Sequence, residues 1–166
     1  MYNEMKQKAM PMEDDCGLER RVYVGGLTNE WRSKIVTLLE VKNISYYMPD
    51  ITVNDTPRKT EEHEMKKNKC ALALYFVRAD DTFTALELGI SARDRDVYTL
   101  GFFIYEGIDQ KVKDMQTMSA MLVSRHEKLA FIQKDATTLE QALSMTDTTL
   151  GNMDMIVNLV KKNREW

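Results

Sequence analysis

The stretch CALALYFV, residues 70 to 77, decides the fold of this chain. It contains no charged residue, and its apolar side chains fall on both of the faces that a β-strand presents. A strand that is apolar on both faces is typical of the middle of a parallel sheet, where helices cover both sides. We therefore predict that residues 70 to 77 form a buried central strand.

Further apolar runs alternate with helical patterns on either side of this strand. RVYVGG (21 to 26) and ISYYMP (44 to 49) precede it, and VYTLGFFIY (97 to 105) and LAFIQ (129 to 133) follow it. Strands that alternate with helices indicate βαβ units with right-handed crossovers. The expected fold is α/β: a flavodoxin-like or Rossmann-like three-layer αβα domain with a five-stranded parallel sheet, order 2-1-3-4-5.

The helical segments differ in what they are expected to bury. In residues 81 to 94 the apolar residues lie three and four apart, which predicts that they face the sheet. These residues are Phe83, Leu86 and Ile90. Residues 59 to 69 form a polar helix with few core contacts, on which His63 is expected to be solvated. The tail from residue 151 is one more amphipathic helix, and it could also serve self-association.

The composition indicates a single cytoplasmic domain. The 166 residues carry a net charge of −3, with 23 Lys and Arg against 26 Asp and Glu, so no nucleic-acid partner is expected. Cys16 and Cys70 lie far apart, which favours a reducing compartment over a disulfide or a paired metal site. No apolar stretch predicts a membrane span or a signal peptide. Residues 1–19 are expected to be a flexible leader, and residues 20–166 the domain.

A ligand is expected at the carboxyl ends of the first and third strands, where the order of the sheet reverses. The sequence delivers two glycines and several polar residues to this place. They are Gly25, Gly26, Asp80, Asp81, Thr84 and Glu87. The glycines permit close approach of a ligand, although a plain turn explains them equally well. Asp81 and Glu87 could reach one small ligand together; alternatively, Asp81 caps the helix and Glu87 is solvated.

Four motifs resemble those of the nucleoside 2-deoxyribosyltransferase family: VYVGG, NEWRSKI, YYMPD and TALELGISA. The resemblance covers residues 21 to 104, and its most specific part is an Asp followed six residues later by Glu-Leu-Gly. It implies that Glu87 is the nucleophile, that Asp81 positions and charges it, and that Tyr23 contacts it. It also implies a homo-oligomer. One departure concerns residues 82 to 86, which are not glycine-rich as in many members, so the substrate is left open.

The resemblance also implies residues that bind the substrate. A carboxylate in the segment before the third strand recognises the base in that family, and both Glu61 and Glu64 are candidates here. Asp50 closes the YYMPD motif and is counted with them. Arg32 could bind a phosphate at the end of the first strand, or it could be an ordinary surface arginine.

The reaction implied is cleavage or transfer of an N-glycosidic bond at C1′ of a nucleoside or nucleotide. A carboxylate beside an oxocarbenium-like centre can form a covalent glycosyl intermediate, here on Glu87, without a metal or a cofactor. The partner is then a small nucleoside or nucleotide. The alternative is a protein of the same fold that binds or sequesters a nucleotide-like ligand without turning it over.

Overall fold

The computed structural model of the protein describes residues 17–26, 30–50, 57–78, 81–94, 96–104 and 130–165. The strands in these residues are β1 (Glu19–Val24), β2 (Ser45–Tyr47), β3 (Cys70–Arg78), β4 (Tyr98–Ile104) and β5 (Ala130–Thr137). The helices are α1 (Glu30–Val41), α2 (Pro57–Lys67), α3 (Thr82–Arg93), α5 (Leu139–Leu150) and α6 (Met153–Arg164).

The first four strands form a parallel sheet in the order β2-β1-β3-β4, and β5 pairs with β4. Tyr23 of β1 lies opposite both Tyr47 of β2 and Ala73 of β3. β3 lies between β1 and β4, and its residues up to Val77 are all buried. The prediction of a parallel α/β fold with order 2-1-3-4 and a central third strand is confirmed.

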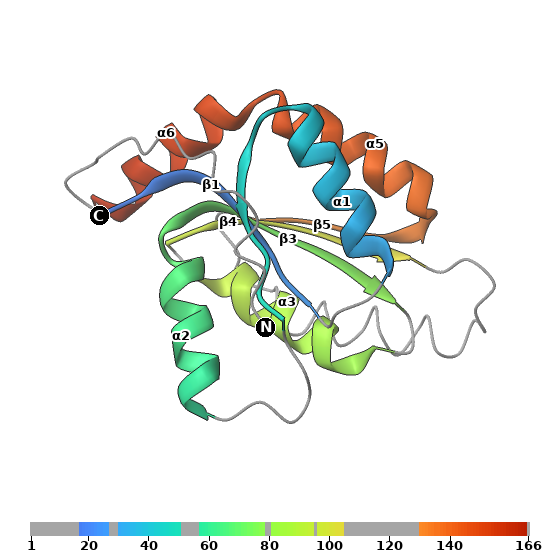
Figure 1. The fold of residues 1–166 in the computed structure, drawn as a ribbon, viewed down its shortest axis with the longest axis horizontal. Helices are drawn as coiled ribbons and strands as arrows, with labels where there is room; N and C mark the ends of the chain where they lie inside the picture. Colours follow the sequence, from blue (N-terminus) through green and yellow to red (C-terminus); the bar gives the residue numbers. More distant parts are fainter. Residues whose placement is uncertain are drawn as a thin grey trace.

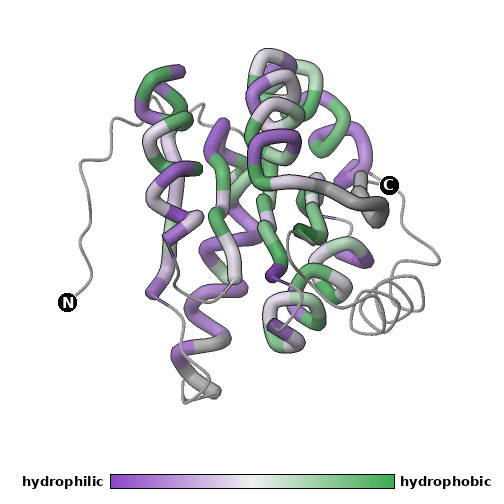
Figure 2. Tube along the Cα trace, turned by 90° about the vertical axis from the view of Figure 1, so that its right-hand side faces the viewer, coloured by the Kyte–Doolittle hydropathy of each residue, from purple (hydrophilic) through white to green (hydrophobic). Residues whose placement is uncertain are grey.

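Helices cover both faces of the sheet, with α1, α5 and α6 on one side and α2 and α3 on the other (Figure 1). In Figure 2 the strands in the middle of the molecule carry much of the hydrophobic colour, with hydrophilic stretches on the surrounding helices. The layer of α1, α5 and α6 packs through aliphatic side chains such as Ile35, Leu39, Leu150, Val157 and Val160. The side with α2 and α3 has a smaller apolar core, which includes two buried tyrosines. The two faces of the sheet therefore differ in chemistry.

Helix α3 faces the sheet with the opposite side from the one that its apolar pattern predicts. Phe83, Leu86 and Ile90 are exposed, Leu86 by 56% and Ile90 by 54%. The residues that α3 buries are small or polar, apart from one leucine. They are Thr84, Ala85, Leu88, Gly89, Ser91 and Ala92. The predicted orientation of this helix is wrong, because its inward face is occupied by polar residues next to the carboxyl ends of the strands.

The domain begins before the boundary that the sequence suggested. Leu18 is 1% exposed and belongs to the core on the α1 side, while the N–H of Glu19 donates to the carbonyl of Lys69 at 2.7 Å. Residues 18 and 19 are therefore part of the fold and not of a leader. Residues 1–16 lie outside the described part of the chain.

The C-terminal helix α6 packs its apolar face against the protein's own core. Met153, Ile156, Val157 and Val160 are buried against the sheet. These four residues are therefore not available for self-association, while Met155 and Leu159 of the same helix are exposed, and self-association through α6 stays a prediction. Among the helices that the structure describes, none has the length and apolar character needed to cross a membrane.

Candidate functional site

The end of β1 is built from two glycines that each leave room for a neighbouring side chain. A Cβ on Gly25 would lie 2.7 Å from Cζ of Tyr75, and one on Gly26 would lie 2.8 Å from Cγ2 of Thr84. These distances are shorter than van der Waals contact, so a larger residue would displace the tyrosine or the threonine. Gly26 also has φ +91°, a conformation that glycine adopts without strain. The protein's own side chains thus fill the space that a ligand was expected to approach.

Three tyrosine rings stand next to one another on the α2–α3 side of the sheet. Tyr23 lies between Tyr47 and Tyr75, with ring centroids 5.8 Å from Tyr47 and 6.4 Å from Tyr75. Burial, and then the nearby carboxylate of Glu87, raises the pKa of both Tyr23 and Tyr75. Both phenols therefore keep their protons at neutral pH, and Tyr23 lies close to Glu87 as the family resemblance implies.

His63 extends this aromatic row from α2. It is 5% exposed, its Nδ1 is 3.2 Å from the hydroxyl of Tyr47, and the two rings are 6.4 Å apart. The expectation of a solvated surface histidine is wrong. Residue 63 faces the sheet because α2 turns one side of an otherwise polar helix inward.

Glu87 lies in the second turn of α3 and turns its carboxyl toward the end of β1. Burial raises the pKa of Glu87 to about 7, with Lys67 opposing and Glu64 adding to the effect. Arg32 and a hydrogen bond with the backbone of Gly26 lower the pKa of this carboxyl as well. The side chain as a whole is partly exposed, but Oε2 is buried and has no hydrogen-bond partner among the described residues. The alternative of a simply solvated helix residue is therefore wrong.

Glu64, and not Glu61, is the carboxylate of α2 that belongs to this site. Glu61 is exposed, whereas Glu64 is half-buried and raises the pKa of Glu87. Only burial and Lys67 have a larger influence on that pKa. The Oε2 atom of Glu64 is 2.7 Å from Nζ of Lys67, whose side chain is 1% exposed. The site therefore contains Tyr23, Glu64, Lys67 and Glu87.

Sequence reasoning missed Lys67 because lysine is almost always solvated. A signal was present in its spacing from His63. The two residues are four apart on α2 and so lie on one face of the helix, and both are buried. Basic and aromatic residues on the inward face of a polar helix could have indicated a polar site beneath it.

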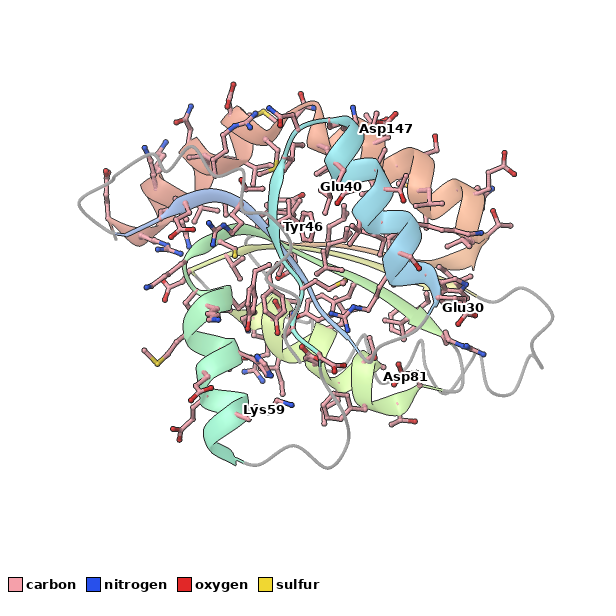
Figure 3. The ribbon with its side chains drawn as sticks, viewed as in Figure 1. Glu30, Glu40, Tyr46, Lys59, Asp81 and Asp147 are labelled. Atoms are coloured by element: carbon pink, nitrogen blue, oxygen red, sulfur yellow. The ribbon has the colours of Figure 1, made fainter. Side chains whose placement is uncertain are left out.

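Asp81 is the N-cap of α3 and binds its own helix. Its Oδ1 accepts a hydrogen bond from the N–H of Thr84 at 2.9 Å, and its Oδ2 accepts one from the Thr84 hydroxyl. Figure 3 shows Asp81 at the start of α3, on the side of the sheet away from Asp147 of α5. The carboxylate expected to act on Glu87 was Asp81, but the one that does so is Glu64. For Asp81 the capping alternative therefore describes the structure.

Arg32 is buried, so it is not the ordinary surface arginine that was one of its two expected roles. Its Nη1 donates to the carbonyl of Gly26 at 3.4 Å, and its Nη2 lies against the carbonyls of Val24 and Pro49. The guanidinium thus ties the end of β1 to the segment after β2. Burial lowers the pKa of Arg32, while the charges of Tyr23, Glu87 and Asp50 raise it. These three hydrogen bonds are to backbone carbonyls, and phosphate binding by Arg32 stays a prediction.

Two predicted site residues remain, Asp50 and Asp80. Asp50 is exposed at the end of the segment after β2 and is near enough to act on Arg32. Asp80 lies outside the described residues. Within the described ranges, no three His, Cys, Asp or Glu side chains are placed to hold a metal ion.

The structure therefore brings Tyr23, Glu64 and Glu87 together, as predicted, and adds Lys67 to them. Arg32 also acts on Glu87 and Tyr23, whereas Asp81 caps α3 and Glu61 is exposed. Comparison with known proteins gives no matching family model and no curated protein of similar sequence.

Proposed function

We propose that the protein cleaves or transfers the N-glycosidic bond of a nucleoside or deoxynucleoside, or of the corresponding nucleotide, with Glu87 as the nucleophile. One observation carries the proposal: the buried, unpartnered Oε2 of Glu87 beside a protonated tyrosine at the carboxyl end of the first strand. An unused carboxylate oxygen in a low-dielectric site is suited to stabilise an oxocarbenium-like centre. The motif resemblance of residues 21 to 104 supports the same reaction, and so does the flavodoxin-like layout completed by β5.

The proposed reaction has two displacement steps at C1′. In the first, a carboxylate oxygen of Glu87 bonds to C1′ as the C1′–N bond breaks, and the base leaves with the electron pair and takes up a proton. In the second, water or another base attacks C1′, the ester bond to Glu87 breaks, and the attacking group loses a proton. Two displacements retain the configuration at C1′. Glu64, which acts on both Tyr23 and Glu87, is then the group that recognises the base.

The direct test incubates the protein with a deoxynucleoside and a second free base, and follows exchanged nucleoside and released base by chromatography. Glu87→Gln should remove both products, whereas Glu140→Gln, on the exposed first turn of α5, should retain them. Acid-quenched intact-mass measurement should show a deoxyribosyl adduct in the parent protein and none in Glu87→Gln. Equal product formation by the parent and Glu87→Gln would overturn the proposal.

A second function, binding of a nucleotide-like ligand without turnover, is favoured by the packing of Thr84. Its methyl group lies directly against Gly26, in the segment that is glycine-rich in many members of the resembled family. A side chain at this point narrows the space between β1 and α3. Under this reading nucleosides or nucleotides raise the melting temperature, yet no product forms and no adduct appears in the parent protein.

A further inference from the structure

Among the residues that the structure describes, Lys67 is the most deeply buried charged residue that the proposed reaction leaves without a role. Its side chain is 1% exposed, and Nζ lies 2.7 Å from Glu64 Oε2 and 3.7 Å from Asp94 Oδ2. Removing an ammonium from water is costly unless anions compensate for it closely. Apolar residues of similar volume often replace buried ion pairs without loss of stability, so stability alone does not explain a lysine here.

The position of Lys67 connects α2 to the face of α3 that carries Glu87. Asp94 is the C-cap residue of α3, and its N–H donates to the carbonyl of Ser91. Glu87, Ser91 and Asp94 are four and three residues apart, so they form one stripe along the helix. Lys67 binds the C-terminal end of this stripe, and Glu87 lies two turns away toward the N-terminus. Lys67 thus contacts the same side of α3 that carries the proposed nucleophile.

We propose that Lys67 is a positioning residue for Glu87: its ammonium holds Glu64 in place and supplies the positive charge that allows Glu87 to ionise beside Glu64. Two neighbouring carboxylates cannot both lose their protons easily without a cation near them. Lys67 is that cation. The role in catalysis rests on the proposed function, whereas the electrostatic role does not.

The charges around Glu87 are consistent with this assignment. The titratable groups that face Glu87 from the packed elements are Tyr23 of β1, Arg32 of α1, Glu64 and Lys67 of α2, and Tyr75 of β3. Burial is the largest influence on the pKa of Glu87 and raises it, and Lys67 is the strongest influence that lowers it. Arg32 has less effect, and its guanidinium is engaged with backbone carbonyls. Lys67 is thus the main source of positive potential at the carboxyl.

The experiment measures the pKa of the Glu87 carboxyl directly, by ¹³C NMR titration of the full chain labelled at the glutamate side-chain carboxyl. The Glu87 resonance is assigned by its loss in Glu87→Gln. Lys67→Met should raise the pKa of Glu87 by roughly one pH unit or more, since opposite charges within reach shift a carboxyl by about 1–3 units. Lys67→Arg, which keeps the charge, should leave it close to that of the parent protein. An unchanged pKa of Glu87 in Lys67→Met would overturn the proposal.

Glu64→Gln provides the reciprocal measurement and keeps the test usable if Lys67→Met fails to fold. It removes the like charge and frees the ammonium, so the pKa of Glu87 should fall. A pKa of Glu87 that stays in place or rises in Glu64→Gln also overturns the proposal. Circular dichroism melting of each variant shows which of them are folded.

Activity assays distinguish this proposal from the proposed function. If the nucleoside reaction occurs, the acid limb of its pH profile should move upward in Lys67→Met by the same amount as the NMR pKa. A folded parent protein without any nucleoside turnover defeats the proposed function, while the titrations still decide the electrostatic role of Lys67. If the pKa of Glu87 rises in Lys67→Met but the acid limb of the pH profile of activity stays in place, the catalytic role of Lys67 is overturned.

Discussion

Asp81 holds both polar groups of Thr84, the backbone N–H at 2.9 Å and the side-chain hydroxyl, and so fixes the first turn of α3. An N-cap of this type contributes about 1 kcal/mol, within a range of about 0.5–2 kcal/mol. We expect Asp81→Ala to lower the free energy of unfolding by about that amount, measured by urea denaturation. Asp81→Asn retains an acceptor oxygen and should lose less. A large loss of nucleoside turnover in a fully folded Asp81→Asn would contradict the capping role and restore a catalytic one.

The activity should increase with pH through about 7, which is the pKa to which burial raises the Glu87 carboxyl. The nucleophile must be ionised to attack C1′, and kcat/KM reports ionisations of the free enzyme. The measurement is kcat/KM for base exchange at constant ionic strength over the range in which the fold is stable. A profile that is flat from about pH 5.5 to 8.5 would exclude Glu87 as the ionising nucleophile.

Glu87→Gln should stabilise the protein at high pH. The pKa of Glu87 is about 7 in the folded state against 4.5 for an ordinary glutamate, so between these values the unfolded chain releases a proton that the folded chain retains. Folded stability from this group is therefore full below pH 4.5, falls as the pH rises, and is lost above about 7. A neutral glutamine avoids that loss, which we estimate at roughly 1 to 3 kcal/mol at pH 8.

Urea denaturation of Glu87→Gln and the parent protein at pH 4.5 and pH 8 checks this sign. The difference in unfolding free energy should be near zero at the lower pH and should favour the glutamine at the higher. A variant that is destabilised equally at both values would indicate that Glu87 serves the fold and not a reaction.

Gly25→Ala should be strongly destabilising, by about 1–3 kcal/mol or more, because its Cβ would enter the space of the Tyr75 ring. The ring is buried within β3 and has little freedom to withdraw. Gly151→Ala is the matched control: Gly151 has helical φ and ψ, and outside its chain neighbours the nearest atom to an added Cβ would be the carbonyl oxygen of Thr148, at 3.3 Å. Thermal melting should separate the two variants, and a similar melting temperature for both would show that Tyr75 can move aside.

The strands were predictable because their signal is local and strong. Residues 70 to 77 are apolar on both faces, and that pattern has a single stable place in an α/β sheet. The role of Asp81 as an N-cap was also predictable, because an aspartate at the start of a helix, three residues before Thr84, is a common capping residue.

The orientation of α3 and the inward face of α2 were not predictable in this way. The rule that apolar residues point inward assumes an apolar inner face, and the inner face of α3 carries Thr84, Glu87 and Ser91. His63 and Lys67 lie on a helix whose composition matches that of a solvated one, so their burial depends on where Tyr23, Tyr47 and Glu64 lie in space. Such partners come from distant parts of the chain, and single-sequence periodicity carries no information about them.

The difference between the two faces of the sheet has a consequence for how domains of this kind diversify. Aliphatic contacts with α1, α5 and α6 hold the strands from one side, without the titratable residues of the other face. The exchange of one titratable residue on the other side therefore leaves these contacts in place. A recognisable shape can outlast a recognisable sequence for this reason, and relatives of the domain are better sought by the placement of a few charged atoms than by overall likeness.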